Sequence, residues 1–157
     1  MTRAHLRRAD VTDASAVAGV HRVSRADYYG VAPAVDDDRE AMWSQLLVQP
    51  GRVTWVAEES GQTLGFASVH HRADPTSQLE LTAMYVLPAH YGCGIGSLLH
   101  DAFEEERTDV EPGALEVWAA NARAVAFYVR RGWVPTSQTR PGPQDVDFVT
   151  YHLPAGR

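Results

Sequence analysis

Residues 79–99 read LELTAMYVLPAHYGCGIGSLL. The run over residues 79–86 predicts a strand that stops before Pro88, because proline cannot donate to a strand ladder. A glycine-rich segment follows, and apolar side chains then recur at i, i+3, i+4, i+7 and i+8, the spacing of an amphipathic helix. The members of that stripe are Ile95, Leu98, Leu99, Ala102 and Phe103. The sequence therefore predicts a strand, a glycine loop and a helix in direct succession.

The glycine loop has the properties of an anion-binding site. Gly92, Gly94 and Gly96 expose backbone N–H groups at the positive end of the helix dipole, which suits a phosphate or pyrophosphate. The alternative is a flexible turn whose glycines only permit tight packing. The G-x-G-x-G spacing differs from the dinucleotide pattern G-x-G-x-x-G, and no lysine follows the last glycine as in a P-loop. A Rossmann-type protein that binds NAD is therefore a weakly supported alternative.

Short elements precede and follow this segment. Upstream, the pattern predicts a strand over residues 5–9 and a helix over residues 13–27, with Asp10 or Thr12 as the cap and Gly30 as the end. A second helix is expected between Asp36-Asp37-Asp38 and Pro50-Gly51, followed by a hairpin of strands 52–58 and 63–71. Downstream, it predicts a strand over 114–119, a helix over 121–131 and strands over 133–137 and 147–153. The order βααβββαβαββ is that of an α/β fold with one mixed sheet flanked by helices.

Composition limits the function classes. The length of 157 residues is that of one domain spanning residues 1–157. With 20 acidic against 14 basic residues, the formal net charge of −6 argues against nucleic acid as a partner. Every one of the basic residues is arginine, which excludes lysine-based covalent catalysis. A single cysteine, Cys93, and the lack of a membrane-length apolar run predict a cytoplasmic protein without disulfides or a membrane partner.

Three segments of the chain, taken together, match the pattern of a known family. They are residues 80–99, the stretch NARAVAFY over residues 121–128, and Gly132-Trp133. Together they resemble the acetyl-CoA-binding core of the GNAT superfamily of N-acetyltransferases. Gly94 and Gly96 match the family's loop pattern, whereas Tyr91 stands where the family has Arg or Gln, which removes one basic or amide contact. The resemblance implies a GNAT-like fold, acetyl-CoA as the co-substrate and no metal. The cofactor-binding residues that it implies are Met84, Tyr85, Val86, Tyr91, Gly92, Cys93, Gly94, Ile95, Gly96, Ser97, Asn121 and Ala124.

Moving an acetyl group from a thioester to an amine requires a neutral amine, a donor to the oxyanion and a proton for the departing thiolate. Glu80 is the candidate base, since the resemblance implies a glutamate that acts through water at this position; the alternative is a solvated glutamate at a strand start. A backbone N–H near residues 84–86 would meet the oxyanion if a bulge separates this strand from the next. Tyr128 is the candidate acid toward the thiolate.

The helix over residues 121–131 has two distinct faces. An apolar stripe predicted to face the core is formed by Ala122, Val125, Ala126 and Val129. Asn121, Ala124 and Tyr128 share another face, which suits a ligand groove. In the alternative, Tyr128 is an ordinary half-buried tyrosine. Asn121, which the resemblance places on the pantetheine arm, can also be the N-cap of the helix.

Other chemically interesting residues fit structural roles at least as well. Cys93 is expected to be an inert loop residue. The adjacent His70 and His71 point to opposite faces of a strand, and the histidines lack metal-ligand spacing. Asp36 to Asp38 can attract a cationic acceptor, although helix capping explains them more simply. Tyr28 and Tyr29 either line an acceptor pocket, as the resemblance implies, or pack in the core.

The expected function is N-acetylation of a primary amine by direct transfer from acetyl-CoA, with Glu80 as base and Tyr128 as acid. The acceptor can be a small amine, an antibiotic or a peptide N-terminus, and a homodimer is the expected assembly. The competing hypothesis is a non-catalytic acyl-CoA-binding or regulatory domain, which would bind CoA without releasing free thiol.

Overall fold

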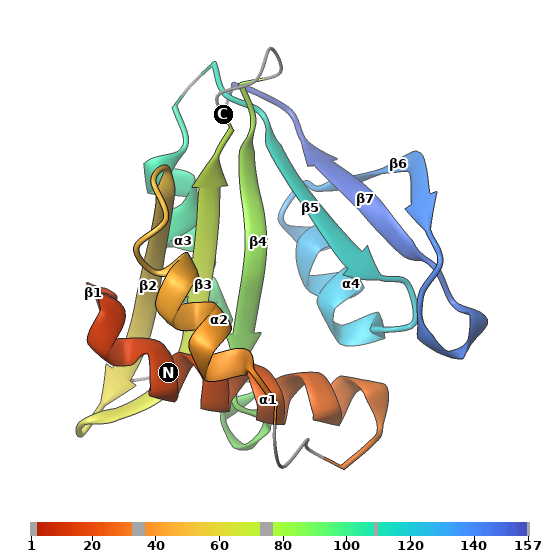
Figure 1. Ribbon diagram of the computed structural model, residues 1–157. Coiled ribbons are helices and arrows are strands. Elements are labelled where there is room, and N and C mark those ends of the chain that lie inside the picture. The colour runs from red at the N-terminus through yellow and green to blue at the C-terminus, as the bar shows by residue number, and fades with distance from the viewer. Residues whose placement is uncertain (1–2, 33–36, 73–76, 109, 157) are drawn as a thin grey trace. The chain divides into compact units, whose positions relative to one another are not determined.

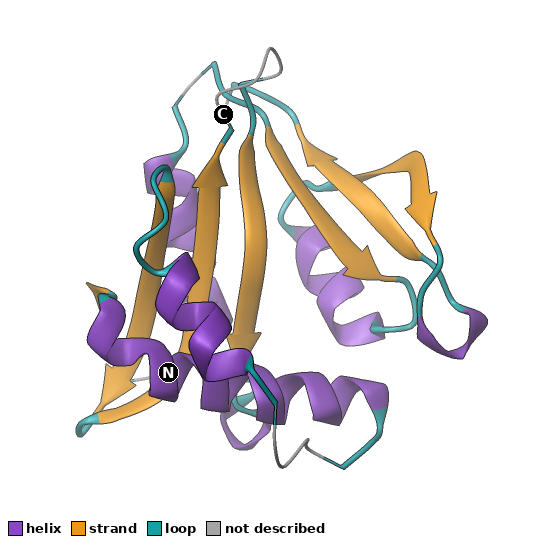
Figure 2. Cartoon of the chain, in the orientation of Figure 1, coloured by secondary structure: helices purple, strands orange, loops and turns teal. Residues whose placement is uncertain are grey.

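A computed structural model describes residues 3–32, 37–72, 77–108 and 110–156 (Figure 1). The strands are β1 (His5–Arg8), β2 (Arg52–Glu59), β3 (Gln62–His71), β4 (Leu79–Val86), β5 (Gly113–Trp118), β6 (Val134–Arg140) and β7 (Phe148–Leu153). The α-helices are α1 (Ala14–Tyr29), α2 (Arg39–Leu46), α3 (Ile95–Glu106) and α4 (Ala122–Arg130). Short 3-10 helices are η1 (Val11–Asp13), η2 (Pro88–His90) and η3 (Pro143–Asp145). The predicted α/β class and the order βααβββαβαββ are confirmed (Figure 2).

The strands pair in the order β1-β2-β3-β4-β5-β7-β6. β4 and β5 are parallel, whereas β1 with β2, β2 with β3, β5 with β7 and β6 with β7 are antiparallel, so the sheet is mixed as predicted. The chain forms two compact units, Met1–His70 with Ala83–Glu106 and His71–Thr82 with Arg107–Arg157. Strand β4 therefore contributes to both. Among the described helices, none has the length and apolar character needed to cross a membrane.

In the first unit, helices cover both faces of β2 and β3 (Figure 1). Val56 on β2 and Phe66 on β3 are register partners, and both are fully buried. They belong to one apolar cluster with Val17 of α1 and Trp43 of α2. This cluster fixes α1 and α2 on one face of the strands, because burying large apolar side chains is the main favourable contribution to packing.

The opposite face of β3 is shaped by Gly65, since neighbouring strand residues point to opposite faces. A Cβ atom at Gly65 would lie 3.2 Å from a methyl carbon of Ile95 and 3.4 Å from one of Leu99, both on α3. It would also lie 2.9 Å from the Tyr85 carbonyl oxygen. Helix α3 and the end of β4 therefore approach β3 more closely than any other residue at position 65 allows.

Helix α1 ends at the predicted Gly30, whereas the predicted cap Asp10 caps the short helix η1 that precedes α1. Asp10 Oδ1 accepts a hydrogen bond from the Thr12 N–H over 2.8 Å, and Gly30 adopts a left-handed φ of 69° at the C-terminal end. The helix runs two residues further than predicted, so that Tyr28 and Tyr29 form its last turn. At α2, Asp37 Oδ1 accepts from the Arg39 N–H over 3.1 Å, as expected of a capping carboxylate. Asp36 lies outside the described residues.

The second unit is tied together at its chain ends by a buried arginine. Arg107 is 3% exposed, and its Nη1 donates to the carbonyl oxygens of Glu111 at 3.0 Å and Pro154 at 2.9 Å. A buried guanidinium needs such acceptors, because an unpaired charge inside a protein is costly. Arg107, where the second segment of this unit begins, is thus linked to Pro154, directly after β7.

The predicted core stripe of α4 is wrong. Ala122 and Ala126 are exposed and Val129 is 52% exposed, whereas Tyr128 is 7% exposed and packs edge-on against Trp133, with ring centroids 5.9 Å apart. Aromatic side chains bury far more area than alanine, so Tyr128 determines the buried face of this short helix. The alanine and valine stripe turns toward solvent as a consequence.

Candidate active site

The predicted site residues divide between the two units, and all of them lie among the described residues. The first unit contains residues 84–86, at the end of β4, and residues 91–97, in the glycine loop. The second unit contains Glu80, Asn121, Ala124 and Tyr128.

The loop between β4 and α3 leaves backbone N–H groups open. Gly92 and Gly94 have φ of 76° and 90°, a left-handed conformation that glycine adopts without strain, and nothing lies within 4 Å of a Cβ at either position. The Leu98 N–H donates to the Gly94 carbonyl over 3.1 Å, so the N–H groups of residues 95–97 precede the first N–H that donates within the helix. These N–H groups lie at the positive end of a 12-residue helix, which is an arrangement that fits a phosphate or pyrophosphate.

Tyr91 connects this loop to α1. Its hydroxyl donates to Asp27 Oδ2 over 3.3 Å. The Cys93 thiol is half-buried and contacts the Tyr91 carbonyl at 3.7 Å, which fits the structural role expected of it. The position where the family has Arg or Gln therefore contributes a contact between the loop and α1.

The end of β4 is hydrogen-bonded to both β3 and α1. The Leu87 N–H donates to the Leu64 carbonyl of β3 over 2.8 Å, and the Ser24 hydroxyl of α1 donates to the Val86 carbonyl over 2.9 Å. In an extended strand the N–H and C=O of one residue point to the same lateral side, and those of its neighbours point to the other. Because Leu87 points toward β3, the N–H and C=O of Val86 point away from β3.

An aromatic cluster joins α1 and α2 to β3 and β4 in the first unit. The Trp43 indole N–H donates to His21 Nδ1 over 3.1 Å, and the His21 ring stacks on Tyr85 with centroids 4.8 Å apart. The Tyr28 and Tyr85 rings lie parallel at 6.2 Å, and their hydroxyl groups share a hydrogen bond. The full cluster consists of His21, Tyr28, Tyr29, Trp43, Phe66 and Tyr85.

Three members of this cluster, His21, Tyr28 and Tyr85, are neutral at pH 7. Burial lowers the pKa of His21 to about 4. Among its charged neighbours, the guanidinium groups of Arg39, Arg25 and Arg22 lower this pKa further, and the carboxylate of Asp37 opposes them. Burial raises the pKa of the Tyr28 and Tyr85 hydroxyls, so both remain protonated.

Three residues of this region were assigned no chemical role from the sequence: His21, Ser24 and Trp43. Ser24 is 2% exposed and falls in register with the buried Val17 and Val20 of α1. A polar side chain within an apolar helix stripe signals a specific hydrogen bond, because burying a hydroxyl without a partner costs free energy. That pattern is visible in the sequence, although the partner is not.

In the second unit, Glu80 lies in the parallel pairing of β4 with β5, directly after Leu79, where that pairing begins. It is half-buried and is the register partner of Ala114. Its Oε2 lies 3.4 Å from Arg72 Nη2. Glu80 is thus ion-paired with Arg72, whereas the alternative considered from the sequence was a solvated glutamate at the start of a strand.

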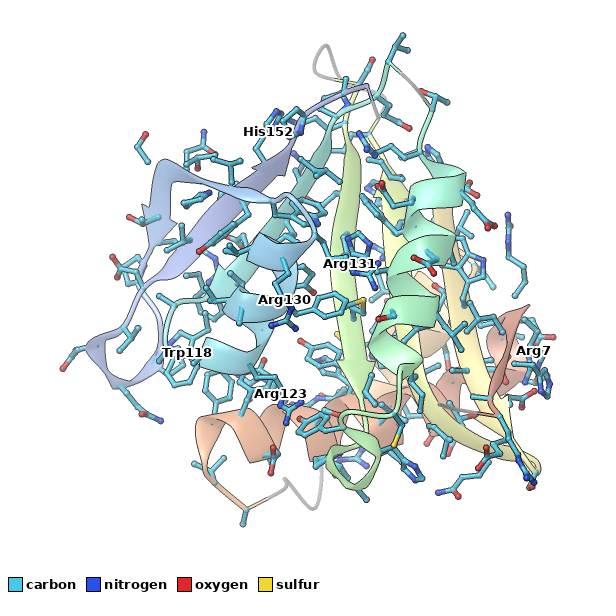
Figure 3. All side chains as sticks on the ribbon, turned by 180° about the vertical axis from the view of Figure 1, so that it is seen from behind. Arg7, Trp118, Arg123, Arg130, Arg131 and His152 are labelled. Carbon is cyan, nitrogen blue, oxygen red and sulfur yellow. The ribbon has the colours of Figure 1, made fainter. Side chains whose placement is uncertain are left out.

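Helix α4 brings Asn121 and Tyr128 to its less exposed side. Asn121 Oδ1 accepts from the Ala124 N–H over 3.3 Å, so Asn121 is the N-cap, as one of the two alternatives predicted. Helix α4 contains Arg123 and Arg130, and Arg131 directly follows it; all three are labelled in Figure 3. The Arg131 guanidinium lies 5.0 Å from the ring centroid of Phe127, a cation–π contact.

Within the described ranges, no three His, Cys, Asp or Glu side chains form a group that could hold a metal ion. In the first unit the candidate residues offer backbone donors, neutral aromatic hydroxyls and a neutral imidazole; in the second unit they include an ion-paired glutamate.

Comparison with known proteins points to one family. A family model described as an acetyltransferase (GNAT) domain matches residues 50–135, which is more than half of the chain. An uncharacterized N-acetyltransferase of Mycobacterium tuberculosis is 31% identical over 98 residues, covering 59% of this chain and 60% of the relative. The chain therefore matches less than two thirds of that relative's length.

Solved structures share the fold over nearly the whole chain. The ribosomal-protein-S18-alanine N-acetyltransferase from Escherichia coli superposes with a TM-score of 0.75 at 22% identity, covering 98% of this chain and 95% of that one. The acetyltransferase yncA from Salmonella typhimurium, solved with acetyl-CoA, has a TM-score of 0.72 at 20% identity, covering 99% and 96%. At these identities the likeness concerns the fold.

Proposed function

The chain belongs to the GNAT acetyltransferase family, and we propose that it transfers the acetyl group of acetyl-CoA to a primary amine by direct attack. The observation that carries this proposal is the glycine loop, whose open backbone N–H groups lead into the positive end of α3 directly after β4. We propose further that residues 1–157 act as one acetyltransferase domain. The homodimer remains a prediction.

The first unit supplies most of the proposed cofactor site. The backbone N–H groups of residues 92–97, in the glycine loop that Tyr91 begins, would hold the pyrophosphate, and residues 84–86 would hold the acetyl end. Asn121 and Ala124 of the second unit would contact the pantetheine arm. An anion with several acceptor oxygens fits these donors, which need no side-chain cation for a hydrogen bond.

Bound acetyl-CoA supplies an activated acyl carbon, and the chain supplies proton transfer and charge stabilisation. Glu80, acting through water, would take a proton from the ammonium form of the acceptor, so that a neutral amine attacks the acyl carbon. The Val86 N–H, which points away from β3, would donate to the acetyl oxygen as negative charge develops there. As the C–N bond forms and the C–S bond breaks, Tyr128 would give its proton to the departing thiolate.

We propose that α1 and α2 contribute to the acceptor side. Tyr28, Tyr85 and His21 offer uncharged donors and acceptors beside apolar rings, which suits an amine with an apolar body. Asp37 and Asp38, at the start of α2, would attract a cationic acceptor, although Asp37 is also paired with Arg22 at 3.2 Å. The E. coli neighbour named above acts, by its name, on the alanine of ribosomal protein S18, which makes a peptide N-terminus one acceptor class to test.

The decisive experiment measures release of CoA thiol from acetyl-CoA in the presence of a panel of amines: small alkyl amines, aminoglycosides and short peptides with free N-termini. Acetyltransferase activity predicts thiol release that depends on the amine, with a matching acetylated product by mass spectrometry. CoA binding by calorimetry without thiol release for any amine would instead support the non-catalytic acyl-CoA-binding domain. Loss of both binding and release would overturn the cofactor assignment.

A further inference from the structure

Ser24 lies at the centre of the buried side of α1. It is 2% exposed, and its hydroxyl donates to the backbone carbonyl of Val86 over 2.9 Å, across 62 positions of sequence. A buried helical serine often donates to the carbonyl of the preceding turn of its own helix. Here the hydroxyl makes a tertiary bond to the last residue of β4.

The same side of α1 contacts the neighbouring residue of β4 one turn on either side of Ser24. His21 stacks on the Tyr85 ring at 4.8 Å, and Tyr28 lies parallel to it and shares a hydroxyl hydrogen bond with it. Positions 21, 24 and 28 are spaced i, i+3 and i+7, so they lie on one face of the helix. Helix α1 therefore contacts Tyr85 through the His21 and Tyr28 rings, and it contacts Val86 through the Ser24 hydroxyl.

β3 holds the other side of the same two residues. The Leu87 N–H donates to the Leu64 carbonyl, and the Tyr85 carbonyl oxygen lies 2.9 Å from the position that a Cβ of residue 65 would occupy. The peptide groups before and after Val86 are therefore anchored to β3. The Val86 C=O, which points away from β3, takes its hydrogen bond from Ser24 instead.

We propose that Ser24 is a positioning residue for acetyl transfer: by holding the Val86 carbonyl it restrains the backbone dihedrals of Val86, and through them the direction of the Val86 N–H in the preceding peptide group. This inference rests on the proposed function, in which that N–H donates to the acetyl oxygen. Catalytic donors must be preorganised, because a donor that has to reorient during the reaction stabilises the developing charge less. Removing the Ser24 hydroxyl leaves the Val86 carbonyl without its donor, so that the peptide group after Val86 is held only through the Leu87 N–H and the backbone at Val86 is fixed less tightly.

The test compares Ser24→Ala, Ser24→Thr and wild-type protein for binding of acetyl-CoA and of CoA by calorimetry, together with kcat and KM. CoA has no acetyl oxygen, so its Kd is expected to stay unchanged in Ser24→Ala, whereas the Kd of acetyl-CoA rises and kcat falls about tenfold. Ser24→Thr keeps the hydroxyl and is expected to recover most of kcat. Infrared spectra of bound ¹³C-acetyl-CoA should show the carbonyl band moved toward its frequency in water in Ser24→Ala.

Ser68→Ala is the matched control. Ser68 is a buried serine on β3 with hydroxyl partners Thr54 and Arg52, so its loss should lower stability without changing the acetyl-CoA to CoA affinity ratio. If Ser24→Ala does not fold, Ser24→Cys gives the same comparison, because a thiol is a weaker donor of similar size. Equal effects on both ligands, or wild-type kcat in folded Ser24→Ala or Ser24→Cys, overturn the positioning role. A wild-type protein without amine-dependent thiol release would instead overturn the proposed function.

Discussion

The Trp43 indole N–H donates to Nδ1 of His21 over 3.1 Å. In the neutral imidazole this places the ring proton on Nε2, so His21 presents a donor rather than a base to its surroundings. Burial and the nearby guanidinium groups keep the ring in this neutral form at pH 7.

His21 therefore predicts a pH dependence of stability. Its folded pKa of about 4 lies below the ordinary value of 6.5, so the unfolded chain binds this proton first as the pH falls. Stability should be fully present above pH 6.5 and should decrease as the pH falls to 4, by on the order of 3 kcal/mol from this group. Urea unfolding at a series of pH values measures this, and His21→Gln should remove the slope between pH 6.5 and 4. An unchanged slope in His21→Gln would assign the dependence to other groups.

The ion pairs of Arg7 lead to a second prediction about stability, which concerns replacement of this arginine. Its guanidinium bonds the buried Asp13 at 2.7 Å and Glu58 at 2.7 Å, joining β1, η1 and β2. Arg7→Met leaves the Asp13 carboxylate buried without this partner and should cost about 1 to 3 kcal/mol in chemical denaturation. The control Arg140→Met breaks an exposed pair with Glu116 and should cost less than about 1 kcal/mol. Equal stability costs for Arg7→Met and Arg140→Met would show that the burial of Asp13 does not add to the effect of losing its partner.

Gly94→Val tests the glycine loop as the pyrophosphate site. A valine side chain should block approach to the backbone and weaken CoA binding at least tenfold, about 1.4 kcal/mol by calorimetry. Because φ at Gly94 is 90°, the substitution also strains the backbone. Gly61→Val, at a φ of 78° in the hairpin turn of the same unit, controls for that strain and should leave CoA affinity intact. Unchanged CoA affinity in folded Gly94→Val would remove the loop from the cofactor site.

Glu80→Gln tests the proposed base. The substitution keeps the side-chain volume and removes proton affinity, so turnover should fall about 10²-fold at pH 7 and recover partly at higher pH, where more of the amine is free. Glu116→Gln removes another ion-paired carboxylate from the same unit, 2.9 Å from Arg140, and should leave the pH–rate profile unchanged. A wild-type profile in Glu80→Gln would restrict Glu80 to its pairing with Arg72.

Tyr128→Phe separates chemistry from packing. If the hydroxyl protonates the thiolate, turnover should fall roughly 10²-fold while acetyl-CoA affinity and Tm change little. If the hydroxyl is structural, the same change should cost about 0.5 to 1.5 kcal/mol of stability and leave the rate nearly unchanged. Tyr151→Phe, at another buried tyrosine of the same unit, calibrates the packing effect. Near-wild-type turnover in Tyr128→Phe, with chemistry rate-limiting, would refute the acid role.

Local patterns were sufficient for the order of elements and for the glycine loop. β4 is predicted with its observed bounds, because its apolar run ends at a proline, and α3 is predicted because its apolar spacing is regular. The predicted helix end at Gly30 and the predicted hairpin between residues 58 and 63 are also observed, and Gly30 and Gly61 adopt positive φ there. These features depend on residues close together in the sequence.

β6 shows where local pattern fails. Every residue of this strand is exposed, and its extension to Arg140 is supported by pairing with β7 instead of by burial, so no apolar alternation marks it. The buried face of α4 was misassigned for a related reason. Four small or β-branched residues outnumber one tyrosine in the sequence, but the area that Tyr128 buries against Trp133 outweighs them.

The sequence by itself determined the family pattern, the mixed sheet and the residues with suitable chemistry, because each depends on spacing along the chain. The tertiary structure alone decided that Ser24 bonds Val86, that Trp43 fixes the tautomer of His21, and that Arg72 pairs with Glu80. Such partners lie on different elements, and their meeting depends on how helices and strands pack. Packing is a property of the whole chain, because every contact competes for burial with all the others.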